Sequence, residues 1–232
     1  LTDISFKARR GETVALIGAT GSGKTTLLNL IPRFYDATAG QVLVDGADVR
    51  DCTQRSLRNR IGYVSQKAVL FAGSVRSNVS YGDNGQGEIT DAEVRNAVSV
   101  AQGTEFVEAM EGAYDAPIAQ GGTNVSGGQK QRLAIARAVA RKPEIFLFDD
   151  SFSALDYKTD RALRKALGEQ TKDATKIIVA QRIGTIRHAD RILVLEHGKI
   201  VGAGTHEELM KTCPTYQDIA GSQLSKEELL NG

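Results

Sequence analysis

A glycine-rich segment near the start of the chain has the residue types and spacing of a phosphate-binding loop. Gly18–Thr25 reads GATGSGKT and fits the pattern G-x-x-x-x-G-K-[ST]. Glycines let the backbone curl so that successive N–H groups point at phosphate oxygens, and the N-terminus of a following helix adds partial positive charge. Lys24 can reach the β- and γ-phosphates, and the Thr25 hydroxyl can ligate Mg²⁺. The predicted nucleotide contacts are Gly18, Thr20, Gly21, Ser22, Gly23, Lys24, Thr25 and Thr26.

A second candidate is the carboxylate of Asp149. It directly follows the apolar segment Ile145–Phe148, which predicts a buried strand. An acidic residue at a strand end is more often a turn or a helix cap. Its pairing with a phosphate loop favours a magnesium-binding role, in part through water, because the strand end then lies beside the loop.

Val125–Gln129 carries a third signal. Ser126 and Gln129 form a capping box, which predicts a helix start. Gly127 and Gly128 occupy its first turn, although each glycine weakens a helix by about 1 kcal/mol relative to alanine. Bare backbone N–H groups at a helix start suit the close approach of an anion.

Alternating strands and helices must position these residues. A helix is expected from Lys24 to Ile31, and residues 68–141 are rich in alanine and in helical signals, with capping boxes at Thr90 and later at Thr205. This alternation predicts an α/β parallel sheet interrupted by a helical insertion. Strands are expected at Leu1–Phe6, Val14–Ile17, Gln41–Val44, Ile61–Val64, Glu144–Phe148, Thr175–Val179, Arg191–Leu195 and Lys199–Ala203.

Composition narrows the function classes. The chain has 232 residues, a formal net charge of +1, and no apolar stretch near the ~20 residues of a membrane helix. No broad positive field therefore draws it to nucleic acid. Cys52 and Cys213 lie far apart, which argues against a zinc site and favours a reducing compartment. Because the sequence does not start with methionine, we expect it to be a piece of a longer polypeptide. The piece by itself is expected to be soluble. Surface or turn roles, with no metal binding, are expected of His188, His197 and His206.

Taken in order, these segments resemble the nucleotide-binding domain of ABC transporters over essentially the whole chain. The resemblance rests on the phosphate loop, Gln66, Val125–Gln129, Asp149 and Ser153–Asp156. Tyr63–Lys67 and Val69–Val75 are most similar to the lipid and multidrug exporter group. The implied fold is a P-loop NTPase (RecA-like) α/β core with an antiparallel β subdomain and an inserted α-helical subdomain. Its expected parts are 1–66 with 143–222 for the core, 67–142 for the helical subdomain, and 223–232 for a tail.

The resemblance also implies roles and partners. Gln66 would contribute to the Mg²⁺ and water site. Ser126–Gln129 would touch the γ-phosphate of an ATP held by a second nucleotide-binding domain, and Asp156 would lie at the interface between the two. The surface near Leu70 and Phe71 would receive a membrane domain, so that the chain works at the cytoplasmic side of a membrane. The family also stacks adenine on an aromatic residue, expected to lie upstream of this sequence.

Two positions depart from the family. Asp150 stands where members that hydrolyse ATP usually have glutamate, and a shorter base misplaced by about 1 Å can cost about 100-fold in rate. Gln181 replaces a histidine, and an amide cannot relay a proton near neutral pH. Both changes predict ATP binding with slow hydrolysis, as in the degenerate half of a heterodimeric exporter. Val125, in place of the usual leucine, is a conservative change.

Other hypotheses remain open at this point. One is a homodimeric exporter in which Asp150 is a slow base. Another is a soluble ABC-type protein of DNA repair, chromosome organisation or translation, although no heptad tract separates Gln66 from Ser126. A third is a nucleotide sensor that never hydrolyses ATP.

Overall fold

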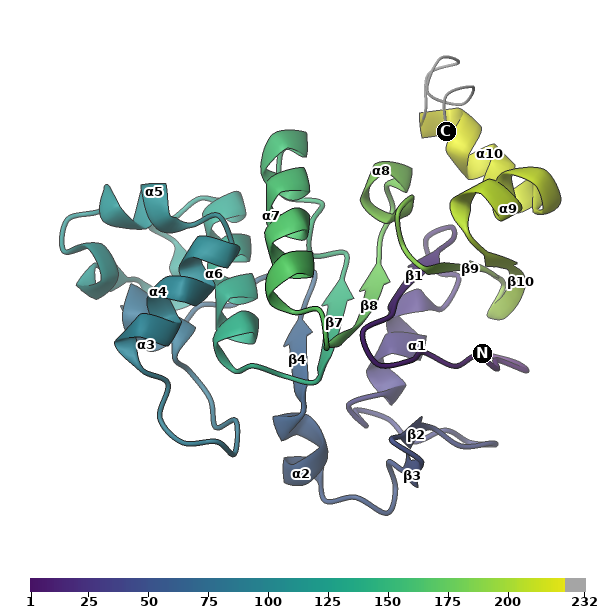
Figure 1. Cartoon of the computed structure of the whole chain (residues 1–232), viewed down its shortest axis with the longest axis horizontal. Coiled ribbons are helices and arrows are strands. Elements are labelled where there is room, and N and C mark those ends of the chain that lie inside the picture. Colours follow the sequence, from purple (N-terminus) through teal and green to yellow (C-terminus); the bar gives the residue numbers. More distant parts are fainter. Residues whose placement is uncertain (224–232) are drawn as a thin grey trace. The chain divides into compact units, whose positions relative to one another are not determined.

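The computed structural model describes Leu1–Gln223 (Figure 1). The chain forms two compact units. The first unit comprises Leu1–Leu57, Leu147–Asp150 and the segment from Thr175, and the second comprises Arg58–Phe146 and Ser151–Ala174. This division by contacts differs from the predicted core and helical subdomains, whose boundaries stay a prediction. The expected tail at 223–232 lies outside the described residues except for Gln223.

A mainly parallel sheet forms the centre of the first unit. Its strands are β1 (Thr13–Ile17), β7 (Ile145–Asp149, which enters from the second unit), β8 (Thr175–Val179), β9 (Arg191–Glu196) and β10 (Lys199–Gly204). The order is β10-β9-β1-β8-β7, with β1 parallel to both β8 and β9, and β10 antiparallel to β9. The apolar residues of β1 are almost fully buried, as expected for a strand covered on both faces. The predicted α/β class is confirmed.

Helices and a short hairpin complete the first unit. The helices are α1 (Lys24–Leu30), α8 (Ile183–Ile186), α9 (His206–Thr212) and α10 (Pro214–Gln223). Helix α2 (Gln54–Asn59) begins in the first unit and ends in the second. The predicted strand Gln41–Val44 is shorter than expected: β2 (Leu43–Val44) turns at Asp45 and Gly46 into β3 (Ala47–Asp48). The strand expected at Leu1–Phe6 is wrong. Asp3 has φ 53, a left-handed conformation that interrupts an extended segment.

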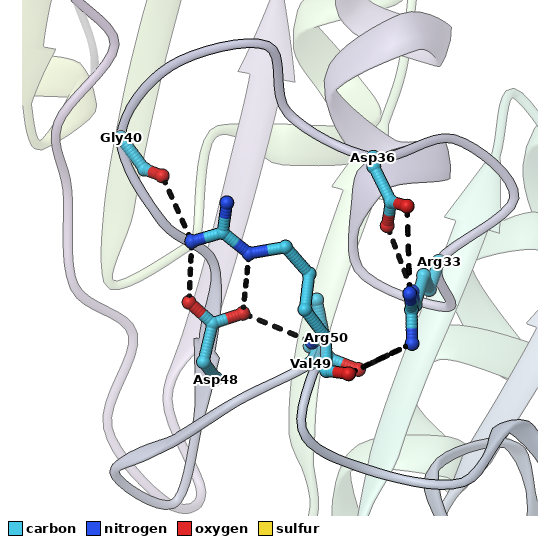
Figure 2. A network of polar contacts seen from close by, with 6 residues as sticks. All are labelled: Arg33, Asp36, Gly40, Asp48, Val49 and Arg50. Atoms are coloured by element: carbon cyan, nitrogen blue, oxygen red, sulfur yellow. Dashed lines mark hydrogen bonds and ion pairs between the residues drawn. The ribbon is translucent and has the colours of Figure 1, made fainter.

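Two arginines connect this hairpin to the residues that follow α1 (Figure 2). The Arg33 guanidinium binds Asp36 at 2.7 Å and donates to the Arg50 carbonyl at 3.1 Å. Arg50 in turn binds Asp48 at 2.7 Å and donates to the Gly40 carbonyl at 3.2 Å. The Arg50 contacts lower the pKa of Asp48 to about 2. These exposed pairs fix the local chain path rather than add much stability.

The second unit is mostly helical. Its helices are α3 (Val75–Val79), α4 (Asp91–Val100), α5 (Thr104–Glu108), α6 (Gly127–Ala140) and α7 (Tyr157–Gln170), with 3₁₀ turns at Ala113–Asp115 and Gln120–Gly122. Strand β4 (Ile61–Val64) neighbours β7, and β5 (Gly73–Ser74) pairs with β6 (Pro117–Ile118). The predicted capping box at Thr90 is present, and its apolar face, Val94, Ala97, Val98 and Ala101, is buried.

A buried polar pair stabilises the end of the first unit. His206 Nδ1 and the Tyr216 hydroxyl lie 2.8 Å apart between α9 and α10, and both side chains are buried. The surface role expected of His206 is therefore wrong, because its ring contacts the buried Tyr216 hydroxyl. Burial lowers the pKa of His206 and raises the pKa of Tyr216 to about 12.

These shifts predict a stability that depends on pH at both ends. Because the pKa of His206 is lowered on folding, its contribution to the free energy of unfolding is present above the unfolded pKa of ~6.5. This contribution is lost as the pH falls below that value. For Tyr216, the contribution is present below the unfolded value of ~10 and is lost as the pH rises toward 12. Urea unfolding across pH 5–8 should show a rise that His206→Gln flattens. An unchanged slope in that variant would contradict the prediction.

Candidate functional site

The predicted phosphate loop forms a tight turn between β1 and α1 in the first unit. Gly18 has φ 154, Gly21 has φ 81 and Gly23 has φ 101, so each glycine adopts a conformation that other residues rarely take. A Cβ on Gly18 would lie 2.1 Å from the Leu195 carbonyl oxygen. At Gly21 the same Cβ would meet no atom within 4 Å. The loop is therefore packed against β9 at its start and open at its middle.

Lys24 curls back over this loop. Its Nζ donates to the carbonyls of Gly18 at 2.7 Å and Ala19 at 2.8 Å, and lies 3.3 Å from Ser22 Oγ. The side chain is 8% exposed. Burial lowers the pKa of Lys24, and the charges of Asp150 and Asp149 oppose that shift. The Lys24 ammonium is thus held against the loop by carbonyl contacts that a bound phosphate can replace.

Thr25 and Asp149 come together as the sequence predicts. The Thr25 hydroxyl donates to Asp149 Oδ1 at 2.9 Å, although the residues are 124 positions apart. Asp149 is buried at the end of β7. A hydroxyl and a carboxylate are the hard oxygen ligands that Mg²⁺ prefers, and one or two such ligands suffice beside nucleotide phosphates. The loop and this oxygen pair therefore fit a nucleotide with Mg²⁺.

Asp150 and Gln181, the two residues that differ from the expected pattern, contact each other. Gln181 Nε2 donates to Asp150 Oδ2 at 2.8 Å. Asp150 is 8% exposed and has φ 48, and its N–H donates to the Val179 carbonyl at 2.9 Å. Aspartate tolerates this left-handed conformation better than most residues. An amide–carboxylate pair that joins the ends of β7 and β8 thus occupies the region beside Lys24.

A contact that the sequence does not reveal reaches the backbone around Gln181. The Gln223 amide donates to the Gln181 carbonyl at 2.7 Å and accepts from the Ile183 N–H at 2.9 Å. A glutamine 42 positions further along the chain belongs to no motif, so only the fold could reveal it.

The remaining predicted residues belong to the second unit. Ser126 caps α6 through a complete capping box with Gln129, as predicted, and Ser126 and Gly127 are exposed. A Cβ on Gly128 would lie 3.4 Å from the Ala154 carbonyl. Gln66 is exposed after β4, and Asp156 caps α7 by accepting from the Thr159 N–H at 2.9 Å. The side chains of the capping box cover the N–H groups of Ser126 and Gln129, whereas Gly127 and Gly128 carry no side chain that could cover their own N–H groups.

An arginine organises the surface expected near Leu70 and Phe71. Leu70 itself is fully buried, whereas Val69 and Tyr81 are more than half exposed. Phe71 and Tyr81 stack with ring centroids 4.5 Å apart, and the Arg137 guanidinium lies over both rings. The aromatic pair, rather than Leu70, is available at this surface.

Arg137 is expected to be a large contributor to the stability of the second unit. It donates to the Asn78 carbonyl at 2.7 Å, the Val69 carbonyl at 2.9 Å and Asn78 Oδ1 at 2.9 Å. Arg137→Met removes these donors, so the free energy of unfolding in urea should fall by about 3 kcal/mol. Arg161→Met, on the exposed side of α7, should change it by less than about 0.5 kcal/mol. Equal losses in both variants would refute this assignment.

No helix within Leu1–Gln223 is long and apolar enough to cross a membrane. The same residues hold no cluster of three or more histidine, cysteine, aspartate or glutamate side chains that could bind a metal ion by themselves. A magnesium site here would accordingly depend on phosphate oxygens in addition to protein ligands.

Comparison with known proteins agrees with this geometry. The family model described as ABC transporter matches residues 1–153. An uncharacterized ABC transporter ATP-binding protein of Mycobacterium tuberculosis is 50% identical over 96% of this chain and 38% of its own length. In Bacillus subtilis, the "Putative multidrug export ATP-binding/permease protein YgaD" is 44% identical over 94% of this chain and 37% of its own length. The chain thus spans about two fifths of the length of these relatives.

A solved structure extends the likeness to three dimensions. A bacterial Atm1-family ABC exporter with ATP bound superposes with a TM-score of 0.91 and is 36% identical. The match covers 96% of this chain and 39% of that one. The fold is thus the mixed α/β P-loop NTPase domain that the sequence predicts. The chain belongs to the ABC transporter family, whose ATP-binding domains bind ATP with Mg²⁺ and hydrolyse it.

Proposed function

We propose that this chain is the ATP-binding domain of an exporter and that its own ATP site turns over slowly. The observation that carries nucleotide binding is the Thr25–Asp149 hydrogen bond of 2.9 Å, because it places two hard oxygen ligands beside Lys24. The names of relatives support export: one is described as a multidrug export protein and the matched structure is an exporter.

Residues of the first unit have separate roles in this proposal. The backbone N–H groups of Gly18–Thr25 and the Lys24 ammonium bind and orient the phosphates. Thr25 and Asp149 would hold Mg²⁺. The bound nucleotide supplies the phosphoanhydride bond that is cleaved. Asp150 orients the attacking water and accepts its proton.

Slow turnover follows from the pair at Asp150. The carboxylate already accepts a hydrogen bond from Gln181 at 2.8 Å, so Oδ2 is engaged before a water molecule approaches. Aspartate is also one methylene shorter than glutamate, so its oxygens stop further from the water. Gln181 can donate to phosphate or water but cannot relay a proton.

The exposed start of α6 points to a partner. We assign Ser126, Gly127, Gly128 and Gln129 to the γ-phosphate of ATP on a second, different nucleotide-binding domain, with Asp156 at the interface. Turnover then occurs mainly at that partner's site. The aromatic pair Phe71 and Tyr81 is the proposed contact for a membrane domain, which places the chain at the cytoplasmic face of a membrane.

Titration with Mg-ATP tests the binding site. Lys24→Ala and Thr25→Val should each weaken binding by about 10-fold or more, since each removes a charge-assisted contact or a ligand. Lys172→Ala, an exposed lysine of the second unit, is the matched control and should bind as the original chain does. Equal affinities in all the variants would rule out this loop as the nucleotide site.

A further inference from the structure

The C-terminal helix α10 ends on a contact with the loop that carries Gln181. Gln223 is the last described residue of α10, and its side-chain amide faces the backbone between β8 and α8. Its Nε2 donates to the Gln181 carbonyl at 2.7 Å, and its Oε1 accepts from the Ile183 N–H at 2.9 Å. Together the two bonds imitate the pairing of a neighbouring strand with this short segment.

The other end of this connection is the Asp150 carboxylate. Gln181 is held through its carbonyl by Gln223, and it donates from its side chain to Asp150 Oδ2 at 2.8 Å. A displacement of the Gln181 backbone therefore moves the donor that contacts Asp150. Gln181 is exposed, and these hydrogen bonds hold its backbone and its side chain.

Helix α10 itself is firmly anchored. Tyr216 and Ala220 are fully buried on its inner face, and the Tyr216 hydroxyl lies 2.8 Å from His206 Nδ1 of α9. Cys213, directly before α10, is also buried. Gln223 thus extends from a rigid element onto an exposed loop, which is the arrangement of a positioning residue.

We propose that Gln223 is a positioning residue that fixes the Gln181 loop from the C-terminal helix, so that the state of α10 controls the geometry at Asp150. The predicted effect on catalysis rests on the proposed function, because Gln181 and Asp150 act on ATP only in that proposal. The structural part concerns the backbone from Gln181 to Ile183 alone.

Hydrogen exchange tests the structural part on the whole chain without any nucleotide. In Gln223→Ala the Ile183 amide should exchange about 10-fold faster, the effect of losing one ordinary hydrogen bond. Gln217→Ala is the matched control: it removes a glutamine of the same helix whose amide donates to the Met210 carbonyl instead. Gln223→Glu keeps an acceptor for Ile183 and should retain part of the protection. Unchanged exchange in Gln223→Ala would overturn the proposal.

Turnover tests the catalytic part in the background Asp150→Glu with Gln181→His, which the proposed function expects to be active. Adding Gln223→Ala there should lower kcat about 3- to 10-fold with little change in KM for Mg-ATP. Gln217→Ala should leave kcat unchanged, and an equal fall in both variants would overturn the proposal. If the background itself shows no turnover, the proposed function fails, while the exchange of Ile183 still decides whether Gln223 holds the loop.

Discussion

Gly18→Ala is expected to weaken nucleotide binding by about 100-fold and to destabilise the first unit. The alanine Cβ would lie 2.1 Å from the Leu195 carbonyl oxygen and 2.9 Å from Ser22 Oγ. The carbonyl cannot move away easily, because β9 lies between β1 and β10 in the sheet. The loop must shift instead, which should cost about 1–3 kcal/mol in the free energy of unfolding.

Mg-ATP affinity should fall further than stability alone explains. A displaced loop no longer directs its N–H groups at the phosphates, and loss of about 3 kcal/mol of such contacts corresponds to about 100-fold in affinity. Calorimetric titration measures this directly, and urea unfolding measures the stability of the same samples.

The matched control is Gly21→Ala in the same loop. Gly21 has φ 81 but open space around the added Cβ, so only the backbone strain of about 1–2 kcal/mol applies. This variant should lose less unfolding free energy than the Gly18 variant, and its Mg-ATP affinity should also fall less, because the loop keeps its path. Affinities that fall equally would show that the contact with Leu195 does not position the loop.

Much of both units could be predicted because their signals are local. Val14–Ile17 is an apolar run of strand length, and the glycines after it have no local purpose other than a tight turn. Capping boxes at Thr90, Ser126 and Thr205 involve residues three positions apart, and the structure contains each of them. The Thr25–Asp149 contact is distant in sequence, but motif order indicates it.

The errors come from positions where tertiary context decides. Leu1–Phe6 reads as a strand from the sequence, yet Asp3 takes a left-handed conformation. His206 sits in a polar segment that reads as a surface helix start, and only the position of Tyr216 in α10 shows that the ring is buried. Propensity cannot reveal such packing, because the partner lies on another element.

The contact at Gln223 shows the same limit for the site. Neither Gln181 nor Gln223 forms a pattern with the other, since their bonds join side chain to backbone across 42 positions. The pair Asp150 and Gln181 stood out only as departures from a family. Their 2.8 Å hydrogen bond adds a physical reason for treating them as one unit, since changing either residue alters the environment of the other.

Asp150→Glu combined with Gln181→His is expected to increase ATP turnover by about 100-fold over the original chain, measured as phosphate release with and without a partner domain. Glutamate extends the carboxylate by one methylene toward the water, and histidine restores a group that can relay a proton. Because a histidine titrates near pH 6.5, the rate of the double variant should also depend on pH between 6 and 8.

The single variants distinguish cooperation from simple addition. In Asp150→Glu alone, the Gln181 amide remains and must contact a longer carboxylate. The increase in turnover of this single variant should therefore be a small part of the increase in the double variant. Asp150→Asn removes the base at nearly constant volume and should eliminate residual turnover while Mg-ATP still binds. Fast turnover by the original chain, or no gain in the double variant with its partner, would contradict a degenerate site. In that case Asp150 would be a competent base, and the hydrogen bond from Gln181 would serve to orient it.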